Sequence, residues 1–255
     1  MIRALALVWL LGCGGGGGSG APDAAVHIDA AMIDSRSPDA PIDASPSKGP
    51  ALSRTLYVNT EGVMLVSGND DATLNKIGAI TSHLAAPWLA NDAQRATKIA
   101  AVVSQIQTTL AAYNVSVVAT RPAAAPYDMV VMTDTPAAMF GLPAGLGGLL
   151  SPTCNATPSV ISLLFGSSYA SLTDVQLKNL FANYAIVGFG VAAGIPMSTK
   201  DRDCMCYSDD TCHPTVGPCT IGGAATSMVT PDQCGSDATV MDEAALFLAA
   251  WGPHP

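Results

Sequence analysis

The sequence predicts an α/β domain, and three observations lead to that fold class. Short apolar runs alternate with helix-like segments from Thr55 to the end of the chain. Two of the runs are apolar almost throughout, as expected of strands covered on both faces of a sheet. The alternation of strands and helices favours a mixed sheet with helices packed on it. We expect residues 51–255 to form a single domain, because about 200 residues are ample for one core.

The first elements follow from turn signals and periodicity. Thr55–Asn59 and Val63–Val66 are expected to be short strands around a glycine-containing turn. A long early helix is expected over Asn91–Tyr113, with Asn91 or Asp92 as its N-cap. Val115–Thr120 follows as a strand that ends before a proline. One face of the expected helix is apolar and carries Ile99, Val102, Ile106, Leu110 and Tyr113.

The later elements complete the α/β pattern. Tyr127–Thr133 and Ser159–Phe165 are the two strands with almost continuous apolar sequence. Thr173-Asp174-Val175-Gln176 is a capping-box sequence, which opens a Gly-rich central helix that ends near Ala193. Thr239–Trp251 is expected to be a final amphipathic helix.

The amino terminus is expected to be a lipoprotein signal peptide. One positive charge at Arg3 precedes the apolar run Ala4–Leu11, which is short for an ordinary secretory signal. Leu10-Leu11-Gly12-Cys13 resembles a bacterial lipobox, in which the cysteine is acylated and the signal, here residues 1–12, is removed. The resemblance implies a stable lipid anchor on Cys13 in the bilayer. By resemblance to the sorting of enterobacterial lipoproteins, Gly14 in place of Asp after the cysteine implies the outer membrane of the cell envelope. The alternatives are a plain cleaved signal and an apolar start without a targeting role.

Residues 13–50 are expected to be the lipidated cysteine and an unfolded linker. A run dominated by glycine covers residues 14–20, and a loose Asp-Ala-Pro repeat follows it. Acidic side chains that repel one another, together with prolines, keep such a chain extended.

The whole chain has a net charge of -9 and few Lys and Arg residues. This balance argues against a nucleic-acid partner, which requires clustered cations.

Six cysteines remain besides Cys13, and most of them lie in the last fifth of the chain. An even number in an exported chain predicts disulfides in a disulfide-rich C-terminal part, but it leaves their pairing open. The candidates are Cys154, Cys204, Cys206, Cys212, Cys219 and Cys234. The alternative is a zinc site made of the cysteines around His213, since thiolates and imidazole bind zinc. Its spacing matches no closed zinc pattern, and an oxidising compartment favours disulfides.

The end of the central helix resembles the zinc-binding segment of the metzincin proteases. That family carries His-Glu-x-x-His-x-x-Gly-x-x-His and, further on, a turn that contains methionine. Aligned on Gly194, the segment Val187-Gly188-Phe189-Gly190-Val191-Ala192-Ala193-Gly194-Ile195-Pro196-Met197 has the same spacing. Downstream, Asp203-Cys204-Met205-Cys206-Tyr207 resembles the methionine turn through Met205 and Tyr207. The resemblance covers roughly Thr55–Tyr207 and implies a metzincin-like fold for the domain.

The groups that perform the chemistry in that family are missing from this chain. In the family, three histidines bind zinc, and the glutamate deprotonates the attacking water. Here Val187, Val191 and Met197 occupy the ligand positions, and Gly188 occupies the base position. Valine has no lone pair, glycine has no side chain, and a thioether is a poor ligand for zinc. The sequence therefore predicts an inactive metallopeptidase-like domain without a metal or cofactor.

A second interpretation explains the same segment without a protease ancestor. Tyr184–Ala193 would be a core helix of small residues, and Gly194 would be its C-cap. Neither interpretation predicts catalysis at this helix. Sequence signatures of serine hydrolases, phosphate loops and dinucleotide sites are also missing.

We therefore expect a non-catalytic lipoprotein of the cell envelope that presents a metzincin-like domain to an unknown protein or peptide. An extended peptide would add to such a domain as a further strand. Two rival functions remain open. One is a metal-dependent hydrolase whose zinc site has moved to the Cys/His group, and the other is a purely structural surface protein.

Overall fold

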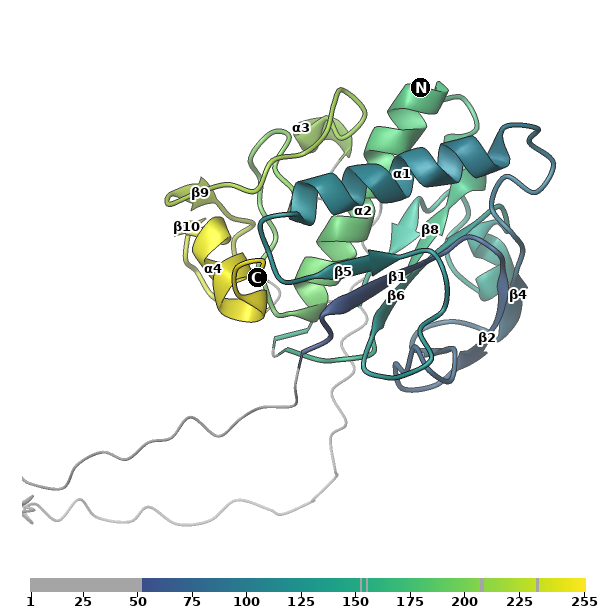
Figure 1. The fold of residues 1–255 in the computed structure, drawn as a ribbon, viewed down its shortest axis with the longest axis horizontal. Coiled ribbons are helices and arrows are strands. Elements are labelled where there is room, and N and C mark those ends of the chain that lie inside the picture. The colour runs from purple at the N-terminus through teal and green to yellow at the C-terminus, as the bar shows by residue number, and fades with distance from the viewer. Residues whose placement is uncertain (1–51, 152, 155, 207–208, 233) are drawn as a thin grey trace, which may run out of the picture. The chain divides into compact units, whose positions relative to one another are not determined.

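A five-stranded mixed sheet forms the centre of the domain in the computed structural model (Figure 1). The structure describes residues 52–151, 153–154, 156–206, 209–232 and 234–255. The strand order is β5-β1-β6-β8-β7, in which the first four strands are parallel and β7 is an antiparallel edge. These strands are β1 (Thr55–Asn59), β5 (Ser116–Val118), β6 (Asp128–Thr133), β7 (Gly148–Leu149) and β8 (Ile161–Phe165). The predicted α/β class with a mixed sheet is confirmed.

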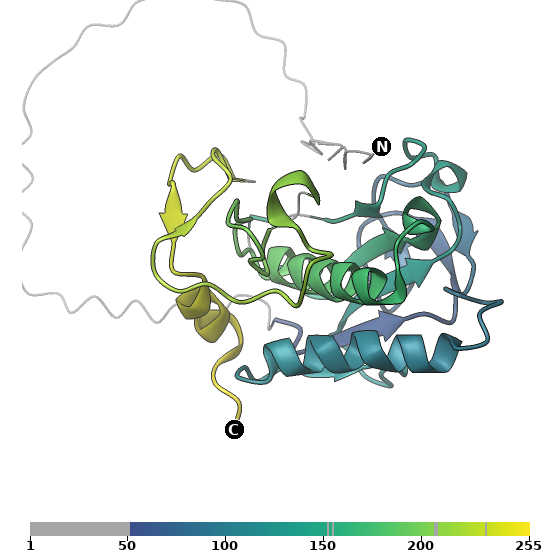
Figure 2. The ribbon, with the colours of Figure 1, turned by 90° about the horizontal axis from the view of Figure 1, so that it is seen from above.

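Four helices accompany the sheet in the described residues. They are α1 (Arg95–Leu110), α2 (Asp174–Ala192), the single turn α3 (Asp209–Cys212) and α4 (Glu243–Trp251). Two 3-10 turns, Ala137–Phe140 and Gly166–Tyr169, lie between strands and helices. The helices α1 and α2 lie side by side on one face of the main sheet (Figure 2).

A smaller sheet and a hairpin-like pair complete the fold. The smaller sheet has the order β3-β2-β4 and consists of β2 (Val63–Ser67), β3 (Lys76–Ile77) and β4 (His83–Ala85). It contributes to the hydrophobic cluster on the face of the main sheet opposite α1 and α2. The strands β9 (Thr226–Ser227) and β10 (Val240–Met241) pair with each other before α4.

The central strands are mostly apolar because both of their faces are buried. On β1, Leu56 and Val58 enter the cluster beneath α1 and α2, whereas Tyr57 enters the cluster on the other face. On β6, Val130 enters the cluster beneath α1 and α2, and Met129 enters the cluster on the other face. Successive side chains of a strand point to opposite faces, so a strand between two layers needs apolar residues at every position. This confirms the interpretation of the two apolar runs as covered strands.

The long early helix begins later than the sequence suggested. Neither Asn91 nor Asp92 is its N-cap, because α1 begins at Arg95 and Gln94 precedes it without a side-chain cap. Asp92 closes the preceding turn instead, where its Oδ1 accepts a hydrogen bond from the backbone N–H of Gln94 over 2.7 Å. The helix also ends earlier than expected, at Leu110, so Tyr113 is buried but lies after it. The predicted apolar face is confirmed for Ile99, Val102, Ile106 and Leu110, which are all buried.

The central helix has the predicted start and end. Thr173 and Gln176 form both hydrogen bonds of a capping box at the start of α2. Gly194 follows the helix with a φ of +78°, a conformation that glycine adopts without strain. The last helix, by contrast, begins at Glu243 and not at Thr239, because Val240 and Met241 are paired with β9.

Three disulfides join the cysteines of the domain, as predicted. The pairs are Cys154–Cys234, Cys204–Cys219 and Cys206–Cys212. Cys204–Cys219 and Cys206–Cys212 cross-link the segment that follows α2. Cys154–Cys234 links the chain after β7 to the chain before β10. Among the described residues, no helix is both long enough and apolar enough to cross a membrane.

The first and last residues of the described fold lie next to each other. The indole N–H of Trp251 donates a hydrogen bond to the carbonyl oxygen of Ser53 over 3.0 Å. Beyond α4, the N–H of His254 donates to the carbonyl oxygen of Ala112, which follows α1, over 3.0 Å. The end of the chain therefore packs against residues that precede β1 and follow α1.

Candidate functional site

The segment that resembles the metzincin zinc helix is the second half of α2 and the turn that follows it. All three ligand positions lie inside the hydrophobic core, since Val187 and Val191 are 0% exposed and Met197 is 1% exposed. None of them has an atom that coordinates zinc well. These positions are therefore filled with apolar packing, in agreement with the chemistry expected of their residue types.

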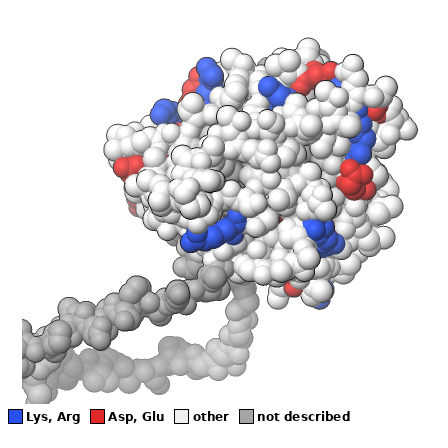
Figure 3. All heavy atoms as spheres, in the orientation of Figure 1, with Lys and Arg blue, Asp and Glu red and all other residues white. Residues whose placement is uncertain are grey.

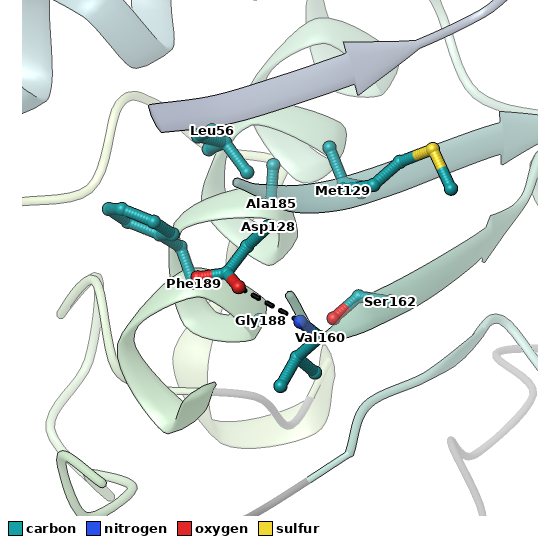
Figure 4. A pocket seen from close by; sticks show the side chains of 9 residues that line it. Leu56, Asp128, Met129, Val160, Ser162, Ala185, Gly188 and Phe189 are labelled. Atoms are coloured by element: carbon teal, nitrogen blue, oxygen red, sulfur yellow. Dashed lines mark hydrogen bonds between the residues drawn. The ribbon is translucent and has the colours of Figure 1, made fainter. Parts of the chain in front are cut away.

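The base position is closed as well as empty of a side chain. A β-carbon on Gly188 would stand 2.5 Å from Ser162 Oγ and 3.4 Å from Leu150 Cδ2. Figure 4 shows Gly188 and Ser162 on facing elements, α2 and β8. A β-carbon at 2.5 Å from another heavy atom forces a displacement in the core. The site therefore has no space for a glutamate unless Ser162 moves.

A buried carboxyl group, which the sequence did not single out, lies close to this contact. Asp128 begins β6 and lines a closed void together with Gly188, Ser162 and Phe189 (Figure 4). Its Oδ1 accepts hydrogen bonds from Ser53 Oγ over 3.0 Å and from the N–H of Val160 over 2.9 Å. Burial raises the pKa of Asp128 to about 7, although these hydrogen bonds oppose the rise. The void has no room for a water molecule. Through its hydrogen bonds, the carboxyl group links β6 to the residues that precede β1 and β8.

The turn that resembles the methionine turn packs directly beneath α2. Met205 is fully buried, and its thioether fills the space beside Gly190 where a β-carbon would stand. After Gly194 the chain folds back, and the N–H of Ile195 donates to the carbonyl oxygen of Gly190 over 3.0 Å. Met205 and the end of α2 therefore form one packed unit. Tyr207, the other residue of the resemblance, lies outside the described residues, as do Cys13, the signal peptide 1–12 and the linker 13–50.

Comparison with protein-family models, with characterised proteins and with solved structures finds no match to this chain. The function is therefore inferred from the geometry of the domain itself.

The Cys/His group proposed as an alternative zinc site is occupied by disulfides. Cys206 is bonded to Cys212, and Cys204 is bonded to Cys219, so none of these sulfurs is a thiolate. His213 is 56% exposed, and its Nδ1 lies 2.9 Å from Asp201 Oδ1. Across the described part of the chain, no three His, Cys, Asp or Glu side chains converge in a way that would hold a metal ion.

Two segments cover the face of α2 that carries the degenerate motif. Thr153 Oγ1 donates to the carbonyl oxygen of Val191 over 3.0 Å. Asn183 Nδ2 donates to the carbonyl oxygen of Pro214 over 3.1 Å, and Asn183 Oδ1 accepts from the N–H of Cys219 over 3.1 Å. The chain after β7 and the disulfide-bonded segment thus close over α2. Val187, Val191 and Met197 are buried, so no open cleft reaches the side chains at the ligand positions.

The free edge of β7 lies next to this covered face. Gly147 accepts a backbone hydrogen bond from Phe165 on β8 over 2.9 Å. Inward and outward groups alternate along an antiparallel strand, so the N–H and C=O of Gly148 point away from β8. Leu150 then packs over Gly188. Among the described residues, no further strand pairs with the outer edge of β7, which is half-exposed and lies beside the degenerate motif.

A shallow groove of about 210 Å³ lies between α1 and α2. Lys98 crosses it with ion pairs to Asp92 over 2.6 Å and to Asp174 over 2.7 Å, so its cation is already neutralised. The face of the molecule in Figure 3 is largely uncharged, and its Lys and Arg residues are interspersed with Asp and Glu. This face shows no basic area of the kind that binds a phosphate backbone.

Proposed function

We propose that the chain is a non-catalytic lipoprotein of the cell envelope and that its domain is a metzincin-like pseudo-protease that binds an extended peptide or protein segment. The observation that carries the proposal is the complete burial of Val187, Val191 and Met197, together with the closure of Gly188 by Ser162. A hydrolytic site needs ligands and a base that reach solvent or substrate. At this helix the positions concerned are part of the core.

The metzincin-like ancestry is supported by two local features together. The helix is interrupted at Gly194, as in the family motif, by a left-handed residue. The methionine at the corresponding downstream position packs under the same helix, against Gly190. A core helix of small residues would account for the burial, but it would not require a methionine at this place in the sequence.

The binding function is supported by the edge strand β7. Its outward backbone groups at Gly148 match the needs of an extended peptide that pairs with a sheet edge. The peptide would run beside the segment that covers α2, where a substrate would lie if the domain retained a cleft. Backbone pairing would supply affinity, and the side chains beside the edge would supply selectivity.

The absence of catalysis is tested by measuring the zinc content of the full-length chain, purified from an oxidising compartment, by elemental mass spectrometry. We expect well below one equivalent, even after incubation with excess zinc. Nearly one tightly held equivalent would overturn the proposal. In that case, loss of the zinc in His213→Ala would assign it to the relocated Cys/His site.

The binding function is tested with a library of displayed unstructured peptides, followed by N-methylation of the backbone of each selected peptide. A peptide that adds to β7 alternates between groups that face the sheet and groups that face away. We expect N-methylation at every second residue to abolish binding, and N-methylation of the intervening residues to leave it intact. Binding that tolerates N-methylation throughout, or a library without binders, would contradict strand addition.

A further inference from the structure

Two buried carboxyl groups face each other where the segment that carries Met205 meets the start of α4. Asp203 is 2% exposed, and Glu243 is fully buried. Asp203 Oδ2 lies 2.8 Å, and Glu243 Oε2 lies 3.0 Å, from the point where a β-carbon on Gly222 would stand. The two side chains therefore converge on one face of this glycine. If both were ionised, two negative charges would stand close together in a medium that screens them poorly.

The hydrogen bonds of this carboxyl pair satisfy only one oxygen of each group. The backbone N–H of Met205 donates to Asp203 Oδ1 over 3.1 Å, and the N–H of Gly222 donates to Glu243 Oε2. Within the described residues, no donor reaches Asp203 Oδ2 or Glu243 Oε1. Buried acceptors without a donor are costly. A single proton on Glu243 Oε1, donated to Asp203 Oδ2, would satisfy both oxygens and remove one of the two charges.

We propose that Asp203 and Glu243 share one proton, and that the protonated pair fastens α4 to the segment Ser198–Cys206. The attachment is reinforced at Gly222, whose carbonyl oxygen accepts a hydrogen bond from the N–H of Ala244 over 2.8 Å. Removal of the proton leaves two like charges at this junction. The pair is therefore a pH-sensitive interaction between α4 and the segment Ser198–Cys206. This proposal is independent of the peptide-binding function.

The surrounding charges do not neutralise the pair. Burial, as the main cause, and the neighbouring Asp203 together raise the pKa of Glu243 to about 9, against the opposing effects of the Gly222 N–H and of Lys200. Tyr113, three residues after the end of α1, also lies near Glu243. Burial and the charge of Glu243 raise the pKa of Tyr113 above its ordinary value of 10.0, so Tyr113 is neutral near pH 8.

The shared proton makes stability fall as the pH rises. The folded state retains a proton that an unfolded chain releases near the ordinary pKa of 4.5, so its stabilisation is complete below that pH and is lost progressively up to about pH 9. Asp128 contributes a similar loss only up to about pH 7. The range from pH 7 to 9 therefore isolates the carboxyl pair. One extra proton in the folded state raises the unfolding equilibrium constant about tenfold per pH unit.

The test is urea unfolding of the full-length chain at pH 7, 8 and 9, combined with infrared spectroscopy at pH 8. In the wild type we expect a change of about tenfold from pH 7 to 8 and a smaller one from pH 8 to 9, as the folded state begins to release the proton. We expect little change in Glu243→Gln, whose amide donates to Asp203 without titrating. Asp203→Asn is the second variant, because its amide donates to an ionised Glu243. Asp128→Asn is the matched control and should keep the slope of the wild type. At pH 8 the carbonyl stretch of a protonated carboxyl group should be present in the wild type and in Asp128→Asn, and absent from both pair variants.

A wild-type stability that does not change between pH 7 and 9 would overturn the proposal. So would a pH dependence of stability in Glu243→Gln and Asp203→Asn that equals that of the wild type. A different cation in place of the proton is also tested. If calcium or magnesium stabilised the wild type but not Glu243→Gln, the pair would be a metal site and the shared proton would be wrong.

Discussion

The thioether of Met205 occupies the space beside Gly190 in which a β-carbon on that residue would stand. Glycine inside a helix is less stable than alanine by about 0.5–1 kcal/mol, because it loses more backbone freedom on folding. At Gly190 this loss is offset by the close packing of Met205 against the helix. The contact explains why residue 190 of this helix is a glycine.

This contact predicts that Gly190→Ala destabilises the domain in spite of its better helix propensity. Overpacking of a full core costs about 1–3 kcal/mol, which exceeds the gain in propensity. In a Met205→Ala background the same change should become stabilising, because the space is then free. Urea unfolding of the two single variants and the double variant measures the coupling. Gly223→Ala is the control, since a β-carbon there contacts nothing within 4 Å. A change of the same sign in both backgrounds would contradict the packing.

The disulfides should differ in their contributions to stability according to the loops they close. The separations are 80 residues for Cys154–Cys234, 15 for Cys204–Cys219 and 6 for Cys206–Cys212. In the chain-entropy description, these loops correspond to about 4.5, 3 and 2 kcal/mol. Paired Cys→Ser variants, compared by reversible urea unfolding, should follow that order. If the six-residue loop contributed most, interactions in the folded state would outweigh loop entropy.

The carboxyl group of Asp128 should make the domain less stable as the pH rises from about 4 to 7. Its pKa is about 7 in the folded chain and 3.8 ordinarily, so the folded state binds the extra proton in that range. The difference in unfolding free energy between the wild type and Asp128→Asn should change by up to about 1.4 kcal/mol per pH unit there. It should be constant above pH 7. Chemical denaturation at half-unit pH intervals measures the difference, and a constant difference throughout would show that Asp128 is ionised in the core.

Cys13 is predicted to carry the lipid anchor. Cys13→Ser should abolish metabolic labelling with palmitate and release the protein from the membrane fraction, because several acyl chains are needed for stable attachment. Cys154→Ser serves as the control and should keep both the label and the membrane location. A labelled Cys13→Ser protein would instead indicate acylation elsewhere in the chain.

The elements with strong periodicity could be predicted from the sequence. The four apolar positions within α1 and the capping box of α2 needed no tertiary information, because helix period and cap chemistry are local. The short strands β3, β4 and β7 were missed. Two or three residues such as His83–Ala85 have too little sequence for a pattern, and their pairing is decided by neighbours far along the chain.

The candidate site could be predicted only in part. The residue types at Val187, Gly188 and Val191 already argued against catalysis, and the structure adds that Ser162 closes the base position. The cysteine pairing was not predictable, because six cysteines allow many combinations. The buried carboxyl groups were also missed. Glu243 is the first residue of its helix, a position where an acidic residue is normally solvated, and nothing local indicates that Asp203 faces it.

The hydrogen bond between Trp251 and Ser53 has a mechanical consequence. A pull on the chain ahead of Ser53 enters the fold at β1, which is bonded to β5 on one side and to β6 on the other, both in the parallel sense. Two ladders loaded along their length must shear together, whereas a terminal hairpin could be peeled open one bond at a time. Because the indole of Trp251 is hydrogen-bonded to Ser53, part of the same force is also transmitted to α4. A domain held by its amino-terminal side would therefore meet a pulling force at a strand that is paired along both of its edges.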